Sequence, residues 1–204
     1  EDGKFSKSRG IGVFGTDAKD TGIDPDVFRY YLLINRPEKS DASFQWSDMQ
    51  DKCNNELVAN FGNLINRTAA FINRFFDGIV PYPEFKDSDI GFIERIKIEE
   101  KKVTEKLHEI ELKEALKSIM HISRLGNQYF QENEPWKVIK EDKVRAGTVM
   151  YVLANLASDL AVMIRPYMPD ASDRIFAMLG TDKQDWSSLG TLPVAKGQKI
   201  SEPH

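Results

Sequence analysis

The interval from Ser47 to Gly78 constrains the fold most, because it predicts one long helix that no proline interrupts. Ser47 and Gln50 have the spacing of a capping box, and Gly78 is typical of the residue that follows a helix end. The apolar residues of the interval recur with a period of 3.6, as expected for a helix with a buried stripe. They are Cys53, Leu57, Phe61, Leu64, Ile65, Ile72 and Phe75. This stripe must pack against other helices.

The opposite face of this helix is polar but carries few charges. Asn60, Asn63, Arg67 and Arg74 are three, four and seven residues apart, which places them on one side. Asparagine is a poorer helix former than the Glu and Lys that usually cover a solvated face. The pattern indicates a requirement other than helix stability, although Asn63 and Arg67 taken alone also fit an ordinary polar surface.

Further helices are predicted on both sides of the long one. Asp24 and Pro25 are typical of an N-cap and a first helical residue, and Pro37 ends the helix that they begin at about Arg36. Its expected inward residues are Val27, Phe28, Tyr31, Leu32 and Leu33. Later helices are predicted over about 89–109, 112–131, 143–165 and 169–179. Short connections between them predict an all-α, antiparallel helix bundle. The last twenty or so residues have no helical period, and a short strand pair is one possible structure for them.

Charge and composition exclude several classes of protein. The net charge of −4 gives no basis for indiscriminate nucleic-acid binding, so any such role needs a local site. No apolar run approaches the roughly 20 residues that span a bilayer, and no signal-peptide pattern opens the chain. The single cysteine, Cys53, excludes a disulfide framework and favours a reducing, cytoplasmic location with the thiol in the core. The abrupt ends lead us to expect a piece of a longer protein.

Residues 1–23 form a glycine-rich, irregular segment in which lysine and arginine alternate with serine over residues 4–9. Lys4 and Lys7 are mobile point charges that suit an oligophosphate, with hydroxyl donors around them. A terminus without fixed structure has the same composition. The literal G-x-G-x-x-G at residues 10–15 does not predict dinucleotide binding, because no strand precedes it and no helix begins at its last glycine.

Familiar catalytic and metal-binding patterns are missing from the sequence. The three histidines are His108, His121 and His204, and none lies in an HExxH motif or near a cysteine pair, so no zinc site is predicted. No Ser/His/Asp arrangement is visible either. Trp136 lies in a proline turn between helices. It either packs against the bundle or offers a stacking surface for an unpaired base.

Several motifs in order resemble one known family. The run KFSKS at residues 4–8 resembles the lysine–serine signature of class I aminoacyl-tRNA synthetases, with Phe5 in place of the usual methionine. The later segments RGIGVFG, DTGIDPDVFRYYLL, NNELVANFGNLINR, GNQYFQENEPWK and RPYMPDAS extend the resemblance over essentially the whole chain. Together they resemble the methionyl-tRNA synthetase family, eukaryotic cytoplasmic type.

The resemblance implies a function and a set of residues. The family joins methionine to its tRNA with ATP, together with Mg²⁺, and reads the CAU anticodon of initiator and elongator methionine tRNAs. Lys4 and Lys7 match the lysines that contact the ATP phosphates and stabilise the departing pyrophosphate. Asn63, Arg67 and Trp136 match anticodon-reading positions, and Pro135 shapes the turn that presents Trp136. Asn60 and Arg74 match no reader and are interpreted as phosphate contacts or plain surface.

The resemblance also implies a division of the chain. Residues 1–45 are expected to hold the signature loop and a connecting helix, residues 46–182 the anticodon-binding bundle, and residues 183–204 a tail that packs back on the protein. The family's nucleotide-binding domain would lie upstream and is a further partner. Without that domain the fragment is expected neither to activate methionine nor to bind a cofactor. The alternative is a helical module that binds a protein partner through the charged helix at 89–109 and reads no RNA.

Overall fold

The computed structural model describes residues 15–38 and 42–203, and it confirms the predicted all-α architecture. The elements are α1 (Gly15–Asp20), α2 (Pro25–Ile34), α3 (Trp46–Lys52), η2 (Cys53–Gly62), α4 (Asn63–Phe76), α5 (Asp87–His108), α6 (Leu112–Asn133), α7 (Pro135–Val138), α8 (Lys143–Ile164), α9 (Pro169–Leu179) and η3 (Trp186–Ser188). Here η2 is a π-helix and η3 a short 3₁₀ turn. The boundaries predicted for α2, α5, α6, α8 and α9 agree with these to within a few residues. Helix α1 contradicts the prediction of an irregular segment over residues 1–23, because it begins at Gly15, where no helix was expected.

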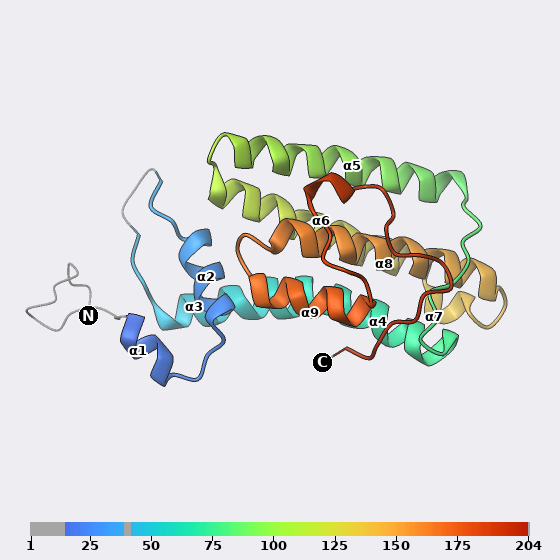
Figure 1. The fold of residues 1–204 in the computed structure, drawn as a ribbon, viewed down its shortest axis with the longest axis horizontal. Coiled ribbons are helices and arrows are strands. Elements are labelled where there is room, and N and C mark those ends of the chain that lie inside the picture. The colour runs from blue at the N-terminus through green and yellow to red at the C-terminus, as the bar shows by residue number, and fades with distance from the viewer. Residues whose placement is uncertain (1–14, 39–41, 204) are drawn as a thin grey trace, which may run out of the picture.

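Consecutive long helices reverse direction along a common axis, so the bundle is antiparallel (Figure 1). Helix α8 lies at its centre, in contact with α4, α5, α6, α7 and α9. All its residues from Ala146 to Ile164 are buried. By length and composition α8 is apolar enough to cross a membrane, but 94% of its most apolar window is buried inside the bundle. Its hydrophobic character is therefore that of a core helix.

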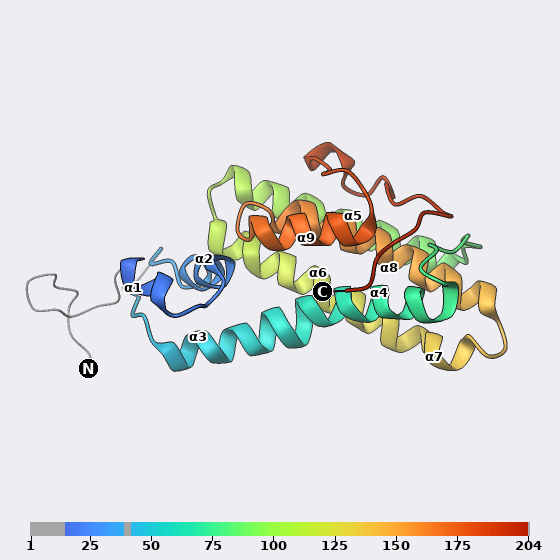
Figure 2. The same ribbon diagram turned by 60° about the horizontal axis from the view of Figure 1, so that its bottom comes forward.

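The long helix predicted from Ser47 to Gly78 is continuous but not uniform, because α3, η2 and α4 follow one another without a break (Figure 2). The predicted capping box is wrong. The helix begins at Trp46 with Gln45 as N-cap, and no side chain caps it. At the other end Asp77 takes the left-handed conformation and Gly78 follows with φ 74°.

The π-helical segment overturns the predicted position of Asn60. A π-helix has i→i+5 hydrogen bonds, so a face predicted with a period of 3.6 does not continue through it. Asn60 is only 7% exposed, and its Nδ2 donates to the carbonyl of Met120 at 3.0 Å. It is therefore a buried contact to α6 and not a phosphate contact or a surface residue. Arg74 remains exposed, with its guanidinium carbon 5.1 Å from the centre of the Phe75 ring.

Helix α2 joins the N-terminal segment to the bundle. Its predicted N-cap is confirmed, since Asp24 accepts a hydrogen bond from the backbone N–H of Asp26 at 2.9 Å. Asp26 is buried and accepts in turn from the N–H of Ala171 at 2.8 Å, which caps α9. One predicted inward residue is wrong, because Leu32 is 58% exposed, whereas Tyr30 on the other side of the helix is buried.

Residues 183–203 cross the outside of the bundle in extended and turning segments. Val194 exchanges backbone hydrogen bonds with the buried amide of Asn155, and Trp186 Nε1 donates to Thr104 Oγ1 at 2.8 Å. The strand pair that the sequence left open does not form. Within the described ranges the only ladder contact is an isolated antiparallel bridge between Ile79 and Lys199. The domain boundaries at 45/46 and 182/183 stay predictions.

A buried pair of carboxyl groups lies beneath this tail. Glu100 of α5 and Asp159 of α8 are 4% and 3% exposed, and their carboxyl groups interact with each other. Asp159 Oδ2 also accepts from the N–H of Gly190 at 3.4 Å. Burial raises the pKa of Asp159 to about 9, and the facing carboxyl of Glu100 adds to the rise. The pair therefore retains a proton at neutral pH.

This pair predicts a specific pH dependence of stability. Between the ordinary pKa of 3.8 and the folded value of about 9, the folded chain keeps a proton that the unfolded chain has lost. The free energy of unfolding should therefore fall as pH rises through this range, with a slope of up to about 1.4 kcal/mol per pH unit. Asp159→Asn should flatten the slope in urea unfolding at pH 5, 7 and 9. The control Asp51→Asn, at an exposed site, should retain it.

Candidate functional site

The predicted site residues of the long helix lie where α4 meets α6. Residue numbers increase together across this contact, since Asn63 pairs with Asn127 and Arg67 with Phe130. Helices α4 and α6 therefore run in the same direction here. Each is antiparallel to α5, which lies between them in the sequence. Figure 2 shows α6 passing α4 and continuing toward α7.

Asn63 belongs to a chain of side-chain amides. Its Nδ2 donates to Asn127 Oδ1 at 3.2 Å. Asn127 Nδ2 donates to the backbone carbonyls of Asn60, at 3.0 Å, and of Ser123, at 3.3 Å. Asn127 Nδ2 also lies 3.3 Å from Asn60 Oδ1. The amide plane of Asn63 is thus held from the α6 side, and the residue is half-buried.

Arg67 and Trp136 meet on the ring of Phe130. The guanidinium carbon of Arg67 lies 3.9 Å from the centre of that ring, and the Trp136 ring stacks on it with centroids 5.6 Å apart and planes 20° apart. Burial lowers the pKa of Arg67, but an arginine remains cationic at neutral pH. Of the two roles predicted for Trp136, the indole takes the packing role against the core; it remains half-buried, and base stacking stays a prediction.

The turn that carries Trp136 is fixed from the end of α6. Glu134 takes the left-handed conformation with φ 42°, and Pro135 is buried at the first position of α7. Asn133 Nδ2 donates to the carbonyl of Tyr129 at 2.9 Å, while its Oδ1 accepts from Arg145. The predicted role of Pro135 in shaping the turn agrees with this position, because proline at N1 is preorganised for a helix start.

Arg145 connects this turn to a fully buried carboxylate. Its Nη1 and Nη2 lie 2.6 and 2.9 Å from the two oxygens of Asp89, which is 0% exposed. Tyr129 also donates to Asp89. Burial by itself would raise the pKa of Asp89, but the hydrogen bonds from Arg145, Tyr129 and the Lys86 backbone outweigh it and hold the pKa below its ordinary value. The pair is a charged, hydrogen-bonded anchor beneath the site.

Gly62 permits the π-helical turn that precedes Asn63. A Cβ on Gly62 would lie 2.8 Å from the backbone oxygen of Leu57, closer than such atoms approach in folded proteins. Gly62→Ala should therefore cost about 1–3 kcal/mol of stability and displace Asn63. Gly91 is a matched control, because a Cβ there meets nothing within 4 Å and Gly91→Ala should stabilise α5 by about 0.5–1 kcal/mol. Thermal unfolding of both variants checks the difference; equal effects would contradict it.

Asn63 also lines a groove of about 820 Å³. It runs between the η2–α4 segment and α9, which Figure 2 shows as separate layers. Its walls are mostly apolar and include Phe61, Ile175 and Met178. Such a wall accepts a flat ring or an apolar side chain rather than a phosphate.

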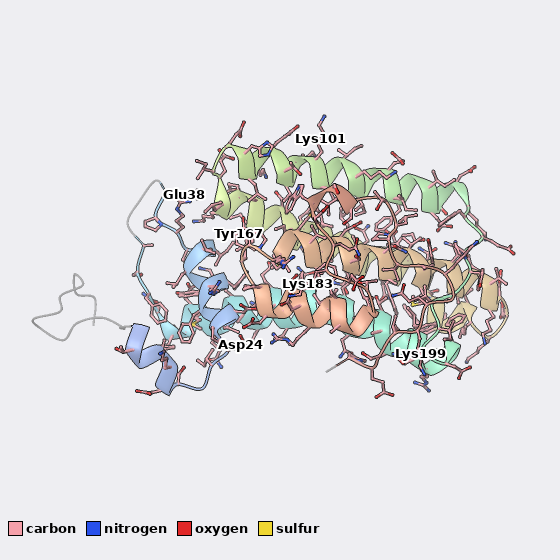
Figure 3. All side chains as sticks on the ribbon, in the orientation of Figure 1. Asp24, Glu38, Lys101, Tyr167, Lys183 and Lys199 are labelled. Carbon is pink, nitrogen blue, oxygen red and sulfur yellow. The ribbon has the colours of Figure 1, made fainter. Side chains whose placement is uncertain are left out.

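The remaining predicted residues fall elsewhere. Lys4 and Lys7 lie outside the described residues, so their role stays a prediction. The charged helix α5 carries surface ion pairs such as Lys97–Glu94, and Lys101 lies on its outer side, away from the bundle (Figure 3). Three carboxylates, of Asp24, Asp26 and Asp170, lie within 4.8 Å of one another, but the first two already act as helix caps.

Sequence reasoning missed Asn127, Phe130 and Arg145. The first two follow the same rule that identified Asn63 and Arg67, since they lie three residues apart on one helix. An interior asparagine next to a glycine, as in Gly126–Asn127, is a weak signal of a special contact. Arg145 gives no comparable signal, because its partner Asp89 lies 56 residues away in the chain.

Comparisons with known proteins relate this chain to one family. Residues 1–69 match the family model of tRNA synthetases class I (M), and residues 82–202 match that of the anticodon binding domain of methionyl tRNA ligase. The cytoplasmic methionine–tRNA ligase of Bos taurus is 50% identical over 182 residues, which are 88% of this chain and 20% of the relative. The probable cytoplasmic methionine–tRNA ligase of Dictyostelium discoideum is 44% identical over 99% of this chain and 28% of its own length.

The fold is also similar to a solved structure, the apo form of Mycobacterium tuberculosis methionyl-tRNA synthetase. The TM-score is 0.85 at 25% identity, over 94% of this chain and 40% of that one. The chain thus spans between about a fifth and two-fifths of the length of these three relatives. It belongs to the methionyl-tRNA ligase family of class I tRNA synthetases, and residues 82–202 match the family's anticodon-binding domain.

Proposed function

We propose that the helical bundle binds the anticodon loop of methionine tRNAs, both initiator and elongator, and reads the CAU anticodon. The observation that carries the proposal is the convergence of three predicted residues on α6. Asn63 reaches Asn127, while Arg67 and Trp136 both contact the ring of Phe130. They form a short row that offers polar groups for base edges beside an aromatic surface.

This arrangement suits an unpaired loop more than a duplex. Unstacked bases bind proteins by stacking on aromatic rings and by hydrogen bonds to their edges. With a net charge of −4, the chain lacks the general attraction to phosphate that dominates non-specific binding. Specific contacts in this row must therefore provide most of the affinity.

The wider activity belongs to the whole protein. We propose that this is a cytoplasmic methionine–tRNA ligase that uses ATP with Mg²⁺ to attach methionine to its tRNA. In that protein Lys4 and Lys7 would contact the ATP phosphates, and residues 1–45 would adjoin the upstream catalytic domain. The 204-residue chain alone is proposed to be inactive. Methionine-dependent pyrophosphate exchange by the purified chain, above a heat-treated control, would contradict that part.

Titration with short RNA stem-loops tests anticodon binding directly. The ligands are labelled anticodon stem-loops of initiator and elongator methionine tRNA, with a scrambled anticodon on the same stem as control. Fluorescence anisotropy at fixed salt should show tighter binding of both CAU loops than of the scrambled loop.

Equal affinity for CAU and scrambled loops, or no binding at all, would favour the alternative of a protein-interaction module. The charged face of α5 would then be the surface to examine, since it carries exposed ion pairs such as Lys97–Glu94.

A further inference from the structure

The side-chain amide of Asn63 has one defined orientation. Backbone carbonyls of η2 and α6 determine which end of the amide, Nδ2 or Oδ1, faces Asn127. The carbonyls of Asn60 and Ser123 can only accept hydrogen bonds, so the group of Asn127 that faces them must be the amino group. Asn127 Oδ1 then points to Asn63, so the amino group of Asn63 must donate the hydrogen bond between them, at 3.2 Å. The remaining end of Asn63 is its carbonyl oxygen.

The same polarity is fixed a second time through Asn60. The Nδ2 of Asn60 donates to the carbonyl of Met120 at 3.0 Å and to Glu56, so its Oδ1 is the end that faces Asn127. Arg124 in turn binds Glu56, because its Nη1 lies 2.7 and 2.9 Å from the two carboxylate oxygens. A flipped amide at either position would place two acceptors against each other. The network therefore has one favourable arrangement.

In the part of the chain that the structure describes, no donor reaches Asn63 Oδ1, whereas its Nδ2 is engaged. One helical turn further on, Arg67 lies over the ring of Phe130 with a guanidinium that offers only donors. The two side chains together present an acceptor beside a set of donors. Such a pattern matches a base edge with an exocyclic amino group next to ring acceptors, as in cytosine and adenine. At the same two positions uracil and guanine carry a carbonyl and a ring N–H.

We propose that Asn127 is a positioning residue that determines base specificity by holding the Asn63 amide with its oxygen outward. This inference rests on the proposed function. It adds that the base facing Asn63 is cytosine or adenine. It also adds that discrimination against uracil or guanine at that position depends on Asn127, which need not touch RNA.

The test compares single-base transitions in the stem-loop, because C→U and A→G exchange an amino group for a carbonyl at the same place. Dissociation constants are measured for CAU and for each of its three single transitions. For the unmodified chain, one transition, at C or at A, should weaken binding by roughly 5- to 140-fold, the range for a well-formed base contact. In Asn127→Leu the Asn63 amide can turn either end outward, so this ratio should collapse to within about 3-fold.

A double variant separates positioning from general damage to the site. Aspartate is an acceptor at both oxygens, so Asn63→Asp needs no neighbour to orient it. Asn63→Asp combined with Asn127→Leu should therefore restore the preference for the base with the amino group, measured as the ratio of the dissociation constants for the transition loop and for CAU. The added charge should weaken binding to all loops. The matched control for Asn127→Leu is Asn73→Leu. Asn73 lies in α4, and like Asn127 it is a half-buried amide that donates to backbone carbonyls. The control should leave the ratio unchanged.

The outcomes distinguish this inference from the proposed function. A chain that prefers CAU, but whose ratio is the same with Asn127→Leu, overturns the inference alone. So does a ratio that collapses but is not restored by the double variant, or a dependence on Asn127 at the uracil position. A chain that does not distinguish CAU from the scrambled loop overturns the proposed function and the inference with it.

Discussion

Replacing Trp136 with alanine is expected to weaken binding of the CAU stem-loop by roughly 5- to 140-fold, the equivalent of about 1–3 kcal/mol for one lost base stack. The indole lies on Phe130 with planes 20° apart and remains half-buried, so part of it is available to a base. Trp136→Phe should keep most of the affinity, since a smaller ring still stacks. Anisotropy titration of both variants at one salt concentration measures the difference.

Trp136→Ala will also remove packing against the core. The control variant must therefore lose a comparable tryptophan at a place away from the proposed RNA site. Trp186 serves for this, because it is a half-buried tryptophan that packs against the core and donates to Thr104, on the tail side of the bundle. Trp186→Ala should lower the melting temperature yet leave RNA affinity within about 2-fold. Equal losses of affinity in the two variants would mean that Trp136 acts only through stability.

Arg145→Met is expected to lower the free energy of unfolding by about 3–5 kcal/mol, the usual cost of removing one partner of a buried ion pair. Asp89 is 0% exposed and the Arg145 side chain 10%, so the remaining carboxylate would have no access to water. The variant also removes the donor to Asn133 and thus loosens the turn before Trp136. Urea unfolding at pH 7 measures the loss of stability.

The same variant should reverse the pH dependence that Asp89 contributes. In the unmodified chain the pKa of Asp89 is held below 3.8, so its stabilisation is present above that pH and is lost as pH falls through the folded value. Without Arg145, burial dominates and raises the pKa of the carboxyl. The folded variant then binds a proton more readily than the unfolded one, so its relative stability should improve as pH falls from 7 toward 4.

Lys117→Met is the matched control for this experiment. Lys117 and Glu114 are 2.7 Å apart, but their side chains are 51% and 43% exposed. An exposed pair of this kind contributes about 1 kcal/mol or less. A loss in Arg145→Met no greater than in Lys117→Met would show that the Asp89 pair does not anchor the site.

The sequence alone predicted the helices and most of their faces, because a period of 3.6 and the end signals are local properties of the chain. Asp24 precedes the first residue of a helix as expected. Asn63, Arg67 and Trp136 were likewise predicted as site residues from amide-rich spacing, a tryptophan in a proline turn and the family resemblance, and this assignment stays a prediction. Local pattern failed at Asn60, where a π-helix with a longer turn replaced the expected period.

What only the tertiary structure decided is how these residues are held. The partners of the site come from positions far apart in the chain: Asn127 is 64 residues from Asn63, and Arg145 is 56 residues from Asp89. No local period reports such contacts, because they depend on which helices pack and in which direction. The polarity of the Asn63 amide is the clearest case. The sequence specifies an amide at that position, but backbone carbonyls of η2 and α6 determine which end of it faces outward.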